Sequence, residues 1–423
     1  MSSEWLKIPL WAVVTEVRKV VEPSVLGAEV MHYSIPSVDE TGGGLVEPSE
    51  DIKSAKLRLA GGEILISKLN PRKSRVVHVA QNDLPIVAST EFVALNPNRS
   101  LDLRFTGYLL QTETVRQRLD SMVQSVTRSH QRVSPEDITH QLVALPPVSE
   151  QRRIADFLDA ETARIDALTE VHDRAATILK ERREAGVNAW VTGAEHRDRR
   201  LSDLAWVDTL PRTWQEVRVG LVARMGSGHT PSRSHPEWWT DCVIPWITTG
   251  EVSQVRDDRR ETIIETRERI SELGLANSAA ELRPAGTVVL CRTASAGYSA
   301  VMGTDMATSQ DFVTWTCGPR LNPYYLLWCL RAMRQDLLGR LAMGSTHKTI
   351  YVPDLQMLRI PLPDVTVQYR IVERIREGND RIDRLMDALR RQVALLAERR
   401  QALITAAVTG QIDVTTARGV EVG

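Results

Sequence analysis

The chain has 423 residues, which predicts two to four structural units rather than one domain. Apolar residues make up 42% and charged residues 25%, as in ordinary globular proteins, and the longest apolar run, 324–330, is too short to span a membrane. The formal charge of −1 excludes a generally polycationic nucleic-acid coat, so DNA contacts would have to come from local patches. The four cysteines form no Cys-x-x-Cys pair, which favours a cytoplasmic protein without disulfides.

Residues 1–148 are predicted to form a mixed, strand-rich domain. The run Glu63-Ile-Leu-Ile-Ser67 follows two glycines and is typical of a short strand, while Tyr108-Leu-Leu is expected to be helical. Residues 149–193 are then predicted to form one long helix, because Pro146 precedes the pattern and Gly193 closes it.

Residues 194–365 repeat this order. A charged linker is expected at 195–200, then a second strand-rich domain that contains a strand at 287–291. Asn322 and Pro323 predict the start of a helix, with Asn as its cap and Pro at its first position. Residues 366–423 are predicted to form a second long helix and a tail.

Both long helices carry apolar residues at heptad-like spacing. The positions expected to pack are Ile154, Leu158, Ile165, Leu168 and Leu179 in the first helix, and Ile371, Ile375, Ile382, Leu385, Leu389, Leu396 and Leu403 in the second. Forty residues of helix span roughly 60 Å, and such a helix is not stable alone. We expect the two helices to pack antiparallel as a coiled coil; a parallel homodimer is the alternative.

The two halves of the chain are related by an internal repeat. At an offset of 217 residues, segments 137–193 and 354–410 share 21 identities in 57 positions. With small gaps the similarity extends upstream, where 89–93 resembles 309–313. The fold class is therefore predicted to be α+β, with two similar mixed domains separated by the two long helices.

No catalytic or metal-binding signature is found. The chain has no phosphate-binding Gly-x-x-x-x-Gly-Lys-Ser/Thr motif, and the spacing of His229, His235 and Cys242 fits no standard metal site.

Four windows contain cations but no acid: 64–82, 121–135, 282–304 and 337–353. Small hydroxylic residues and cations without carboxylates are typical of loops that contact phosphates, although solvated loops would look the same. The predicted DNA-binding residues are Lys68, Arg72, Lys73, Arg75, Arg128, Ser129, His130, Arg132, Arg292, Thr293, Ser295, Ser345, Thr346, His347 and Lys348.

Taken together, these motifs resemble those of the specificity subunits of type I restriction-modification systems. The resemblance is carried by the two-copy layout, by Leu-Pro-Pro-Val-Ser-Glu-Gln-Arg-Arg-Ile at 145–154, by 344–350 with 360–363, and by Val-Thr-Gly at each helix end. It implies two target recognition domains, each reading half of a split site in double-stranded DNA, and an antiparallel helical spacer.

The resemblance also implies partners. Two methyltransferase subunits would dock on the helices and hold the S-adenosylmethionine for adenine-N6 methylation, while the chain itself would bind no cofactor and catalyse nothing. Where a nuclease accompanies the system, two restriction subunits would use ATP and magnesium. A modification-only or fused nuclease-methyltransferase system, and a coiled-coil scaffold that binds no DNA, are the alternatives.

Overall fold

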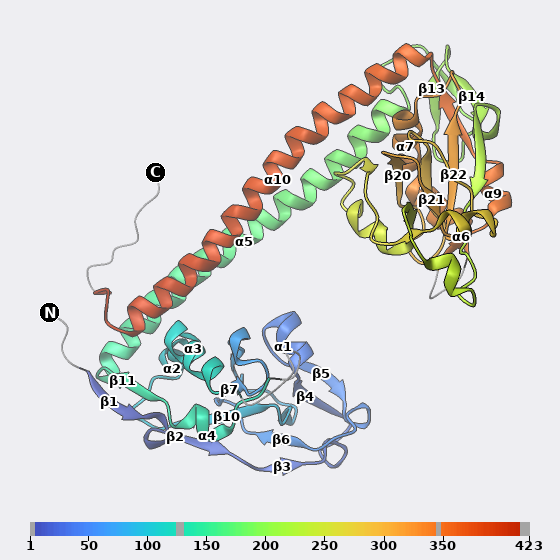
Figure 1. The fold of residues 1–423 in the computed structure, drawn as a ribbon. Coiled ribbons are helices and arrows are strands. Elements are labelled where there is room, and N and C mark those ends of the chain that lie inside the picture. The colour runs from blue at the N-terminus through green and yellow to red at the C-terminus, as the bar shows by residue number, and fades with distance from the viewer. Residues whose placement is uncertain (1–4, 124–130, 344–347, 415–423) are drawn as a thin grey trace. The chain divides into compact units, whose positions relative to one another are not determined.

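The computed structural model describes residues 5–123, 131–343 and 348–414 (Figure 1). The chain divides into two compact units, of which the first comprises residues 1–172 and 391–423 and the second residues 173–390. Both boundaries fall inside long helices, α5 (Val148–Val191) and α10 (Val365–Val408). Each unit therefore combines one mixed domain with parts of both helices, whereas the sequence led us to separate helices from domains. None of the helices in the described ranges is long and apolar enough to cross a membrane.

The first unit contains two sheets and a ribbon. The central sheet has the strand order β2 (Val14–Val17), β10 (Phe92–Pro97), β7 (Ile64–Ser67) and β8 (Val76–His78). The second sheet has the order β3 (Val20–Val21), β6 (Lys56–Leu59), β9 (Ile86–Ala88), β4 (Glu29–Tyr33) and β5 (Leu45–Pro48). Strand β1 (Leu6–Pro9) pairs with β11 (Leu142–Leu145). The short helices are α1 (Ile35–Thr41), α2 (Leu103–Gln111), α3 (Glu113–Ser121) and α4 (Pro135–Thr139).

The second unit is built in a similar way. Its central sheet has the order β15 (Ala223–Ser227), β22 (Phe312–Cys317), β19 (Val288–Cys291), β20 (Ser299–Met302) and β17 (Thr262–Ile263). Three more strands pair in the order β18 (Arg269–Ile270), β16 (Ile244–Ile247) and β21 (Ala307–Thr308). The ribbons are β12 (Arg199–Leu201) with β13 (Thr209–Pro211), β14 (Gln215–Arg218) with β25 (Arg359–Leu362), and β23 (Ala342–Met343) with β24 (Thr349–Ile350). The short helices are α6 (Glu272–Ala276), α7 (Pro323–Ala332), α8 (Arg334–Asp336) and α9 (Val352–Gln356).

The central strand of the first unit is buried on both faces. Ile64 and Ile66 of β7 belong to the core that packs on the helices, while Leu65 belongs to the core between the two sheets. Alternate residues of a strand point to opposite faces, so a run of apolar residues is what this position requires. Strand β19 divides its residues between two cores in the same manner, with Val288 on the helical side and Val289 on the other.

Several expected elements are confirmed. The strands expected near 63–67 and 287–291 are β7 and β19, and the side chain of Asn322 caps α7 by accepting from two main-chain N–H groups. The expected linker at 195–200 is wrong at its end. Arg199 begins β12, which pairs with β13, and its guanidinium donates to the carbonyls of Gly193 and Thr209, which fixes the chain against the end of α5.

A buried glutamine fastens each mixed domain to the start of a long helix. In the first unit, the amide oxygen of Gln151 accepts from the Asp102 N–H at 2.8 Å, and its amide nitrogen donates to the carbonyls of Ser100 and Pro146 at 3.0 and 2.9 Å. In the second unit, Gln368 makes three bonds of the same kind, to the Asn322 N–H at 2.8 Å and to the carbonyls of Arg320 and Pro363, both at 2.9 Å. The residues that lead into α2 and α7 are thereby held on α5 and α10.

Most of the expected packing positions on the long helices lie inward. Ile154, Leu158, Ile165, Ile371 and Ile375 are buried, and Leu179, Ile382, Leu389, Leu396 and Leu403 are partly buried. Leu168 and Leu385 are corrections, because they are 44% and 53% exposed. The inward positions next to them are Thr169 and Met386, one residue further along. One residue turns an α-helix by about 100°, which carries both leucines off the packed face.

Within each unit, the segments of α5 and α10 run side by side in opposite directions (Figure 1). In the first unit Arg400 of α10 pairs with Asp166 of α5, and in the second Arg183 of α5 pairs with Asp383 of α10. Each pair matches the other at an offset of 217 residues, so the same cross-helix ion pair occurs in both units.

Replacement of the buried glutamine in the second unit should destabilise that unit. Gln368→Leu leaves the N–H of Asn322 and two carbonyls buried without partners, and we expect the free energy of unfolding to fall by about 3 kcal/mol. Urea unfolding followed by circular dichroism measures this, with Gln392→Leu at an exposed site of α10 as the control. Equal unfolding midpoints for the two variants would contradict the role given to Gln368.

Candidate nucleic-acid interface

In the first unit, the turn after β7 carries the first group of predicted cations. Asn70 and Ser74 in this turn have left-handed backbone angles, with φ of 51° and 46°. Non-glycine residues in this region cost energy and are concentrated at functional sites. The Asn70 N–H donates to the carbonyl of Gln131 at 2.7 Å, and the Val133 N–H donates to the carbonyl of Lys68 at 3.1 Å. These bonds bring two of the four acid-free windows together.

Arg75 is a correction to the predicted interface. Its side chain is 7% exposed, and its guanidinium donates to both carboxylate oxygens of Asp39, at 2.5 and 2.8 Å. These bonds hold the pKa of Asp39 below its usual range. Arg75 is therefore committed to the interior of the domain, through a partner that lies outside its own acid-free window.

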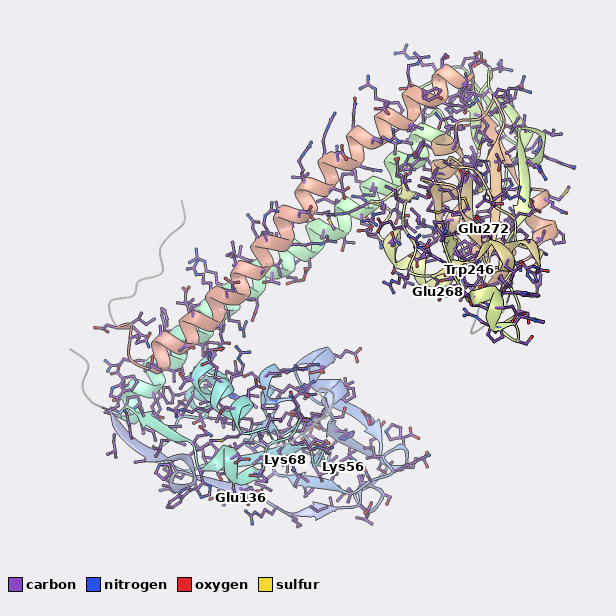
Figure 2. The ribbon with its side chains drawn as sticks, in the orientation of Figure 1. Lys56, Lys68, Glu136, Trp246, Glu268 and Glu272 are labelled. Atoms are coloured by element: carbon purple, nitrogen blue, oxygen red, sulfur yellow. The ribbon has the colours of Figure 1, made fainter. Side chains whose placement is uncertain are left out.

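The other cations of the first unit lie closer to solvent. Lys73 is exposed and lies 3.8 Å from Asp39, while Lys68 (Figure 2) and Arg72 have side chains with no ion pair among the described residues. Arg132 is half exposed and donates to both carboxylate oxygens of Glu91, at 3.0 and 2.9 Å. Lys68 and Arg72 are therefore the cations of this turn whose charge is not neutralised by a carboxylate among the described residues.

The second unit has an equivalent turn after β19. Its predicted residues are Arg292, Thr293 and Ser295. Ala294 has a left-handed φ of 53°, and the Ile350 N–H donates to the carbonyl of Arg292 at 2.8 Å. Ile350 matches Val133 at the 217-residue offset, so the same main-chain bond joins two acid-free windows in each unit.

The side chains of this second turn are partly engaged. Arg292 donates from Nε to the carbonyl of Gln310 at 3.0 Å, and the hydroxyl of Thr293 donates to the carboxylate of Asp311. Ser295 lies 3.5 Å from the guanidinium of Arg256. Lys348 is exposed and has no ion pair in the part of the chain that the structure describes.

Sequence reasoning missed an acid beside each turn. The Lys68 N–H donates to the carbonyl of Glu91, and the Arg292 N–H donates to the carbonyl of Asp311, both at 2.8 Å. The windows without acids in the sequence are therefore not without acids in space. The similarity between 89–93 and 309–313 was the available signal, because it places Glu91 and Asp311 at equivalent positions.

Six predicted DNA-binding residues lie outside the described residues. They are Arg128, Ser129, His130, Ser345, Thr346 and His347.

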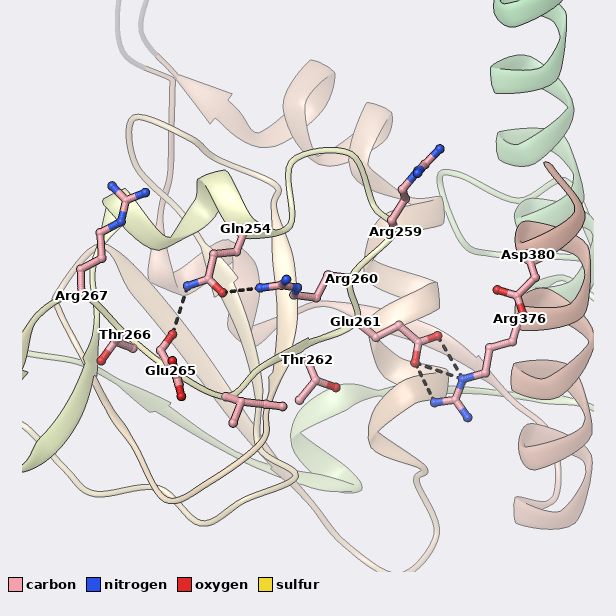
Figure 3. A pocket seen from close by; sticks show the side chains of 11 residues that line it. Gln254, Arg259, Arg260, Glu261, Thr262, Glu265, Thr266, Arg267, Arg376 and Asp380 are labelled. Carbon is pink, nitrogen blue, oxygen red and sulfur yellow. Dashed lines mark hydrogen bonds and ion pairs between the residues drawn. The ribbon is translucent and has the colours of Figure 1, made fainter. Parts of the chain in front are cut away.

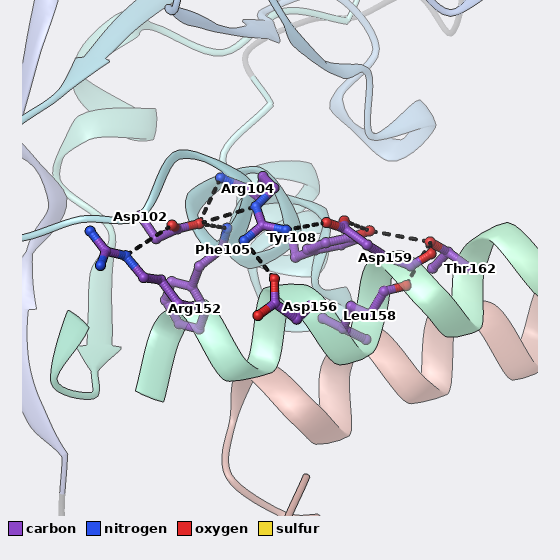
Figure 4. Close-up of polar contacts among 9 residues, drawn as sticks. All are labelled: Asp102, Arg104, Phe105, Tyr108, Arg152, Asp156, Leu158, Asp159 and Thr162. Atoms are coloured by element: carbon purple, nitrogen blue, oxygen red, sulfur yellow. Dashed lines mark hydrogen bonds and ion pairs between the residues drawn. The ribbon is translucent and has the colours of Figure 1, made fainter. Parts of the chain in front are cut away.

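Helix α2 is fixed to α5 by a polar network in the first unit (Figure 4). Arg104 donates to the carboxylates of Asp156 and Asp159 at 2.8 and 2.6 Å, and the hydroxyl of Tyr108 donates to Asp159 at 2.8 Å. Burial raises the pKa of Tyr108 to about 12, so the phenol stays protonated and keeps its role as a donor.

A different network fixes the second domain to α10 (Figure 3). Arg376 donates to the carboxylate of Glu261 at 2.6 Å, and Arg259 donates to Asp387 at 2.8 Å. Arg376, Glu261 and Arg259 border a cavity of about 780 Å³, and Arg267 also belongs to its wall. The segment that contains Arg259 and Glu261 is also anchored to α7. The side chain of Arg331 in that helix is 3% exposed and donates to the carbonyl of Arg260 at 2.7 Å. Burial lowers the pKa of Arg331 to about 10, which leaves it cationic at neutral pH.

A family model for the type I restriction modification DNA specificity domain matches residues 41–177 and 211–393, and the chain belongs to this family. It is 24% identical over 179 residues to the MjaIX specificity subunit of Methanocaldococcus jannaschii, covering 42% of this chain and 40% of that subunit. It is 21% identical over 304 residues to the EcoBI specificity subunit of Escherichia coli, covering 70% and 63%. Both alignments span less than two thirds of the relative.

Two solved structures share the fold. One, described as "Structural basis underlying complex assembly and conformational transition of the type I R-M system", matches with a TM-score of 0.73 at 19% identity and covers 97% of this chain and 99% of that chain. The HsdS subunit from Thermoanaerobacter tengcongensis matches with a TM-score of 0.53 at 20% identity, with 97% and 98% covered.

Arg72 and Arg75 should respond differently to replacement by alanine. Arg72→Ala should weaken specific and random duplex binding equally, leave stability unchanged, and reduce the slope of log affinity against log salt by about 0.9. Arg75→Ala should instead destabilise the first unit by about 1–3 kcal/mol, because it removes a buried bidentate partner. Fluorescence anisotropy over a salt series and urea unfolding separate the two. A changed sequence preference in Arg72→Ala would show that Arg72 reads bases.

Proposed function

We propose that the chain is the DNA-recognition subunit of a type I restriction-modification complex and that it reads a bipartite, asymmetric DNA site. The observation that carries this proposal is the pair of equivalent turns after β7 and β19. The same main-chain bonds form around both turns, but the side chains differ: Lys68 and Arg72 in one, Arg292 and Thr293 in the other. Two turns with the same main-chain bonds but different side chains would bind two different half-sites. Two identical turns would instead bind the two equal halves of a palindrome.

We propose further that α5 and α10 form an antiparallel coiled-coil spacer within a two-copy repeat. The matched ion pairs support this, because Arg400 with Asp166 and Arg183 with Asp383 obey one antiparallel register. In an antiparallel pair, each amphipathic helix buries its apolar face against the other helix of the same chain. The domains would follow the sequence bounds 1–148 and 194–365, with the helices between and after them.

The proposed partners are double-stranded DNA, two methyltransferase subunits and, where a nuclease is present, two restriction subunits. In this proposal the chain is not an enzyme and holds no cofactor. The methyltransferase holds the S-adenosylmethionine, and a nuclease-translocase uses ATP and magnesium. The chain itself binds and orients the DNA. Its cations contact phosphates, and other side chains contact the edges of the bases.

Matched insertions in the two helices test the spacer. Seven residues added after Thr177 and seven after Ala394, which are equivalent at the 217-residue offset, preserve the heptad pattern and both ion pairs. Each helix lengthens by about 10 Å, which corresponds to about three base pairs. Sequencing of methylated DNA should show both half-sites unchanged and the gap longer by about three base pairs.

The matched control places the two seven-residue insertions in loops that lie outside the long helices, one after Asn98 and one after Gly318. This variant should keep the original gap, because both helices retain their length. Altered half-sites with an unchanged gap in the helix variant would contradict the spacer.

A further inference from the structure

In the second unit, an arginine from outside the acid-free windows lies beside the turn between β19 and β20. Arg256 follows the short 3-10 helix η7 (Thr249–Gln254) and is exposed. Its guanidinium lies 3.5 Å from the hydroxyl of Ser295 and 5.6 Å from the ring centroid of Tyr298. A guanidinium within about 6 Å of a ring centroid is attracted by the face of the ring. The serine and the tyrosine therefore hold Arg256 against the turn.

The acids that follow Arg256 in the chain do not neutralise it. Both carboxylate oxygens of Asp258 accept from Arg334 at 2.7 Å, and Asp257 lies 3.9 Å from the guanidinium of Arg259. Arg256 itself has no ion pair within residues 5–123, 131–343 and 348–414. Sequence reasoning missed this free cation because the two carboxylates next to it in the chain face other arginines in the fold.

The tyrosine that contacts Arg256 is held by a second arginine. The guanidinium of Arg334 lies 4.6 Å from the ring centroid of Tyr298, and its charge is already neutralised by Asp258. Asp258 has a left-handed φ of 57°, as Ala294 has in the turn itself. Non-glycine residues in this conformation cost energy and are concentrated at functional sites. Tyr298 therefore gives Arg256 a fixed support.

The first unit places an acid where the second unit places this arginine. Strands β4 and β16 are equivalent, because each pairs in parallel with the strand that precedes one of the similar segments 89–93 and 309–313. Helix α1 follows β4 and carries Asp39, which binds Arg75 of the turn after β7. Helix η7 follows β16 and leads to Arg256. The same part of the fold neutralises a cation in one unit and supplies a cation in the other.

We propose that Arg256 reads a guanine in the half-site of the second unit, an inference that rests on the proposed function. Arginine donates two parallel hydrogen bonds to N7 and O6 of guanine in the major groove, and this is the commonest specific contact with a base. Phosphate contacts carry no sequence information and can be shared by both units, whereas base contacts have to differ between them. Arg256 has no cationic counterpart on α1. Tyr298 already orients its guanidinium, so little side-chain freedom is lost when it binds.

The test uses the complex that contains the full chain, purified from its native cells, and the motif defined by methylation-sensitive sequencing. Competition binding compares duplexes in which each guanine of the motif is replaced in turn. The unaltered complex should discriminate against replacement at one guanine of one half-site. In Arg256→Ala and in Arg256→Lys this discrimination should fall about tenfold, at that guanine alone.

The lysine variant separates charge from geometry. Lysine keeps the charge but lacks the planar fork, so Arg256→Lys should bind random duplex as the unaltered complex does without recovering the preference. The control is Arg218→Ala, which removes another exposed arginine of the second unit, one without an ion pair among the described residues. This variant should discriminate as the unaltered complex does.

Unchanged discrimination at every guanine in both Arg256 variants would overturn the assignment. An equal loss of affinity for all duplexes in Arg256→Ala would overturn it as well, because that result marks a phosphate contact. In either case the proposed function stands. If the unaltered complex binds every duplex with the same affinity, the proposed function itself fails.

Discussion

Both domain cores depend on residues supplied by the far ends of the long helices. Val187 and Val191 lie in the core of the second unit although α5 begins in the first, and Ile404 and Val408 lie in the core of the first unit although α10 begins in the second. A long helix with one apolar face needs a partner, and each domain core needs the helix ends. The contacts between the helix ends and the domain cores bury the apolar faces of the helices and complete the cores at the same time. Each domain is consequently attached to both helices.

This attachment has a common part and a variable part. The buried Gln151 and Gln368 make the same three bonds in the two units. The surrounding polar contacts differ, with Arg104 on Asp159 in one unit and Arg376 on Glu261 in the other. Because the three glutamine bonds are shared and the contacts around them differ, the turns after β7 and β19 can differ in sequence without a change in how the domains are attached to the helices.

The elements governed by local pattern could be predicted from the sequence. The long helices, the strands β7 and β19 and the cap at Asn322 follow from periodicity, glycine turns and capping chemistry, each of which involves residues close together in the chain. The sequence could not predict to within one residue which positions of the long helices face inward. Leucine is more apolar than threonine, so the pattern favoured Leu168, but Thr169 is the residue that turns inward. Packing between helices decided that register.

The candidate interface was predictable only in part for a related reason. The turns after β7 and β19 can be recognised in the sequence, because their cations and hydroxyl groups lie in windows that contain no acidic residue. The partners of those cations come from other elements of the same domain: Asp39, the partner of Arg75, lies in helix α1, and Glu91, the partner of Arg132, lies in the turn before β10. Sequence separation hides such pairs, so the free cations, Lys68, Arg72 and Lys348, emerge only once the fold is known.

The most direct test of the central claim is methylation-sensitive sequencing of the native genome, with and without the gene for this chain. If two different recognition turns are held apart by one helical spacer, the gene should account for one methylated motif with two unlike half-sites and a fixed gap. The motif should vanish when the gene is deleted. A continuous motif, a palindromic motif, or a bipartite motif that survives the deletion would contradict the account.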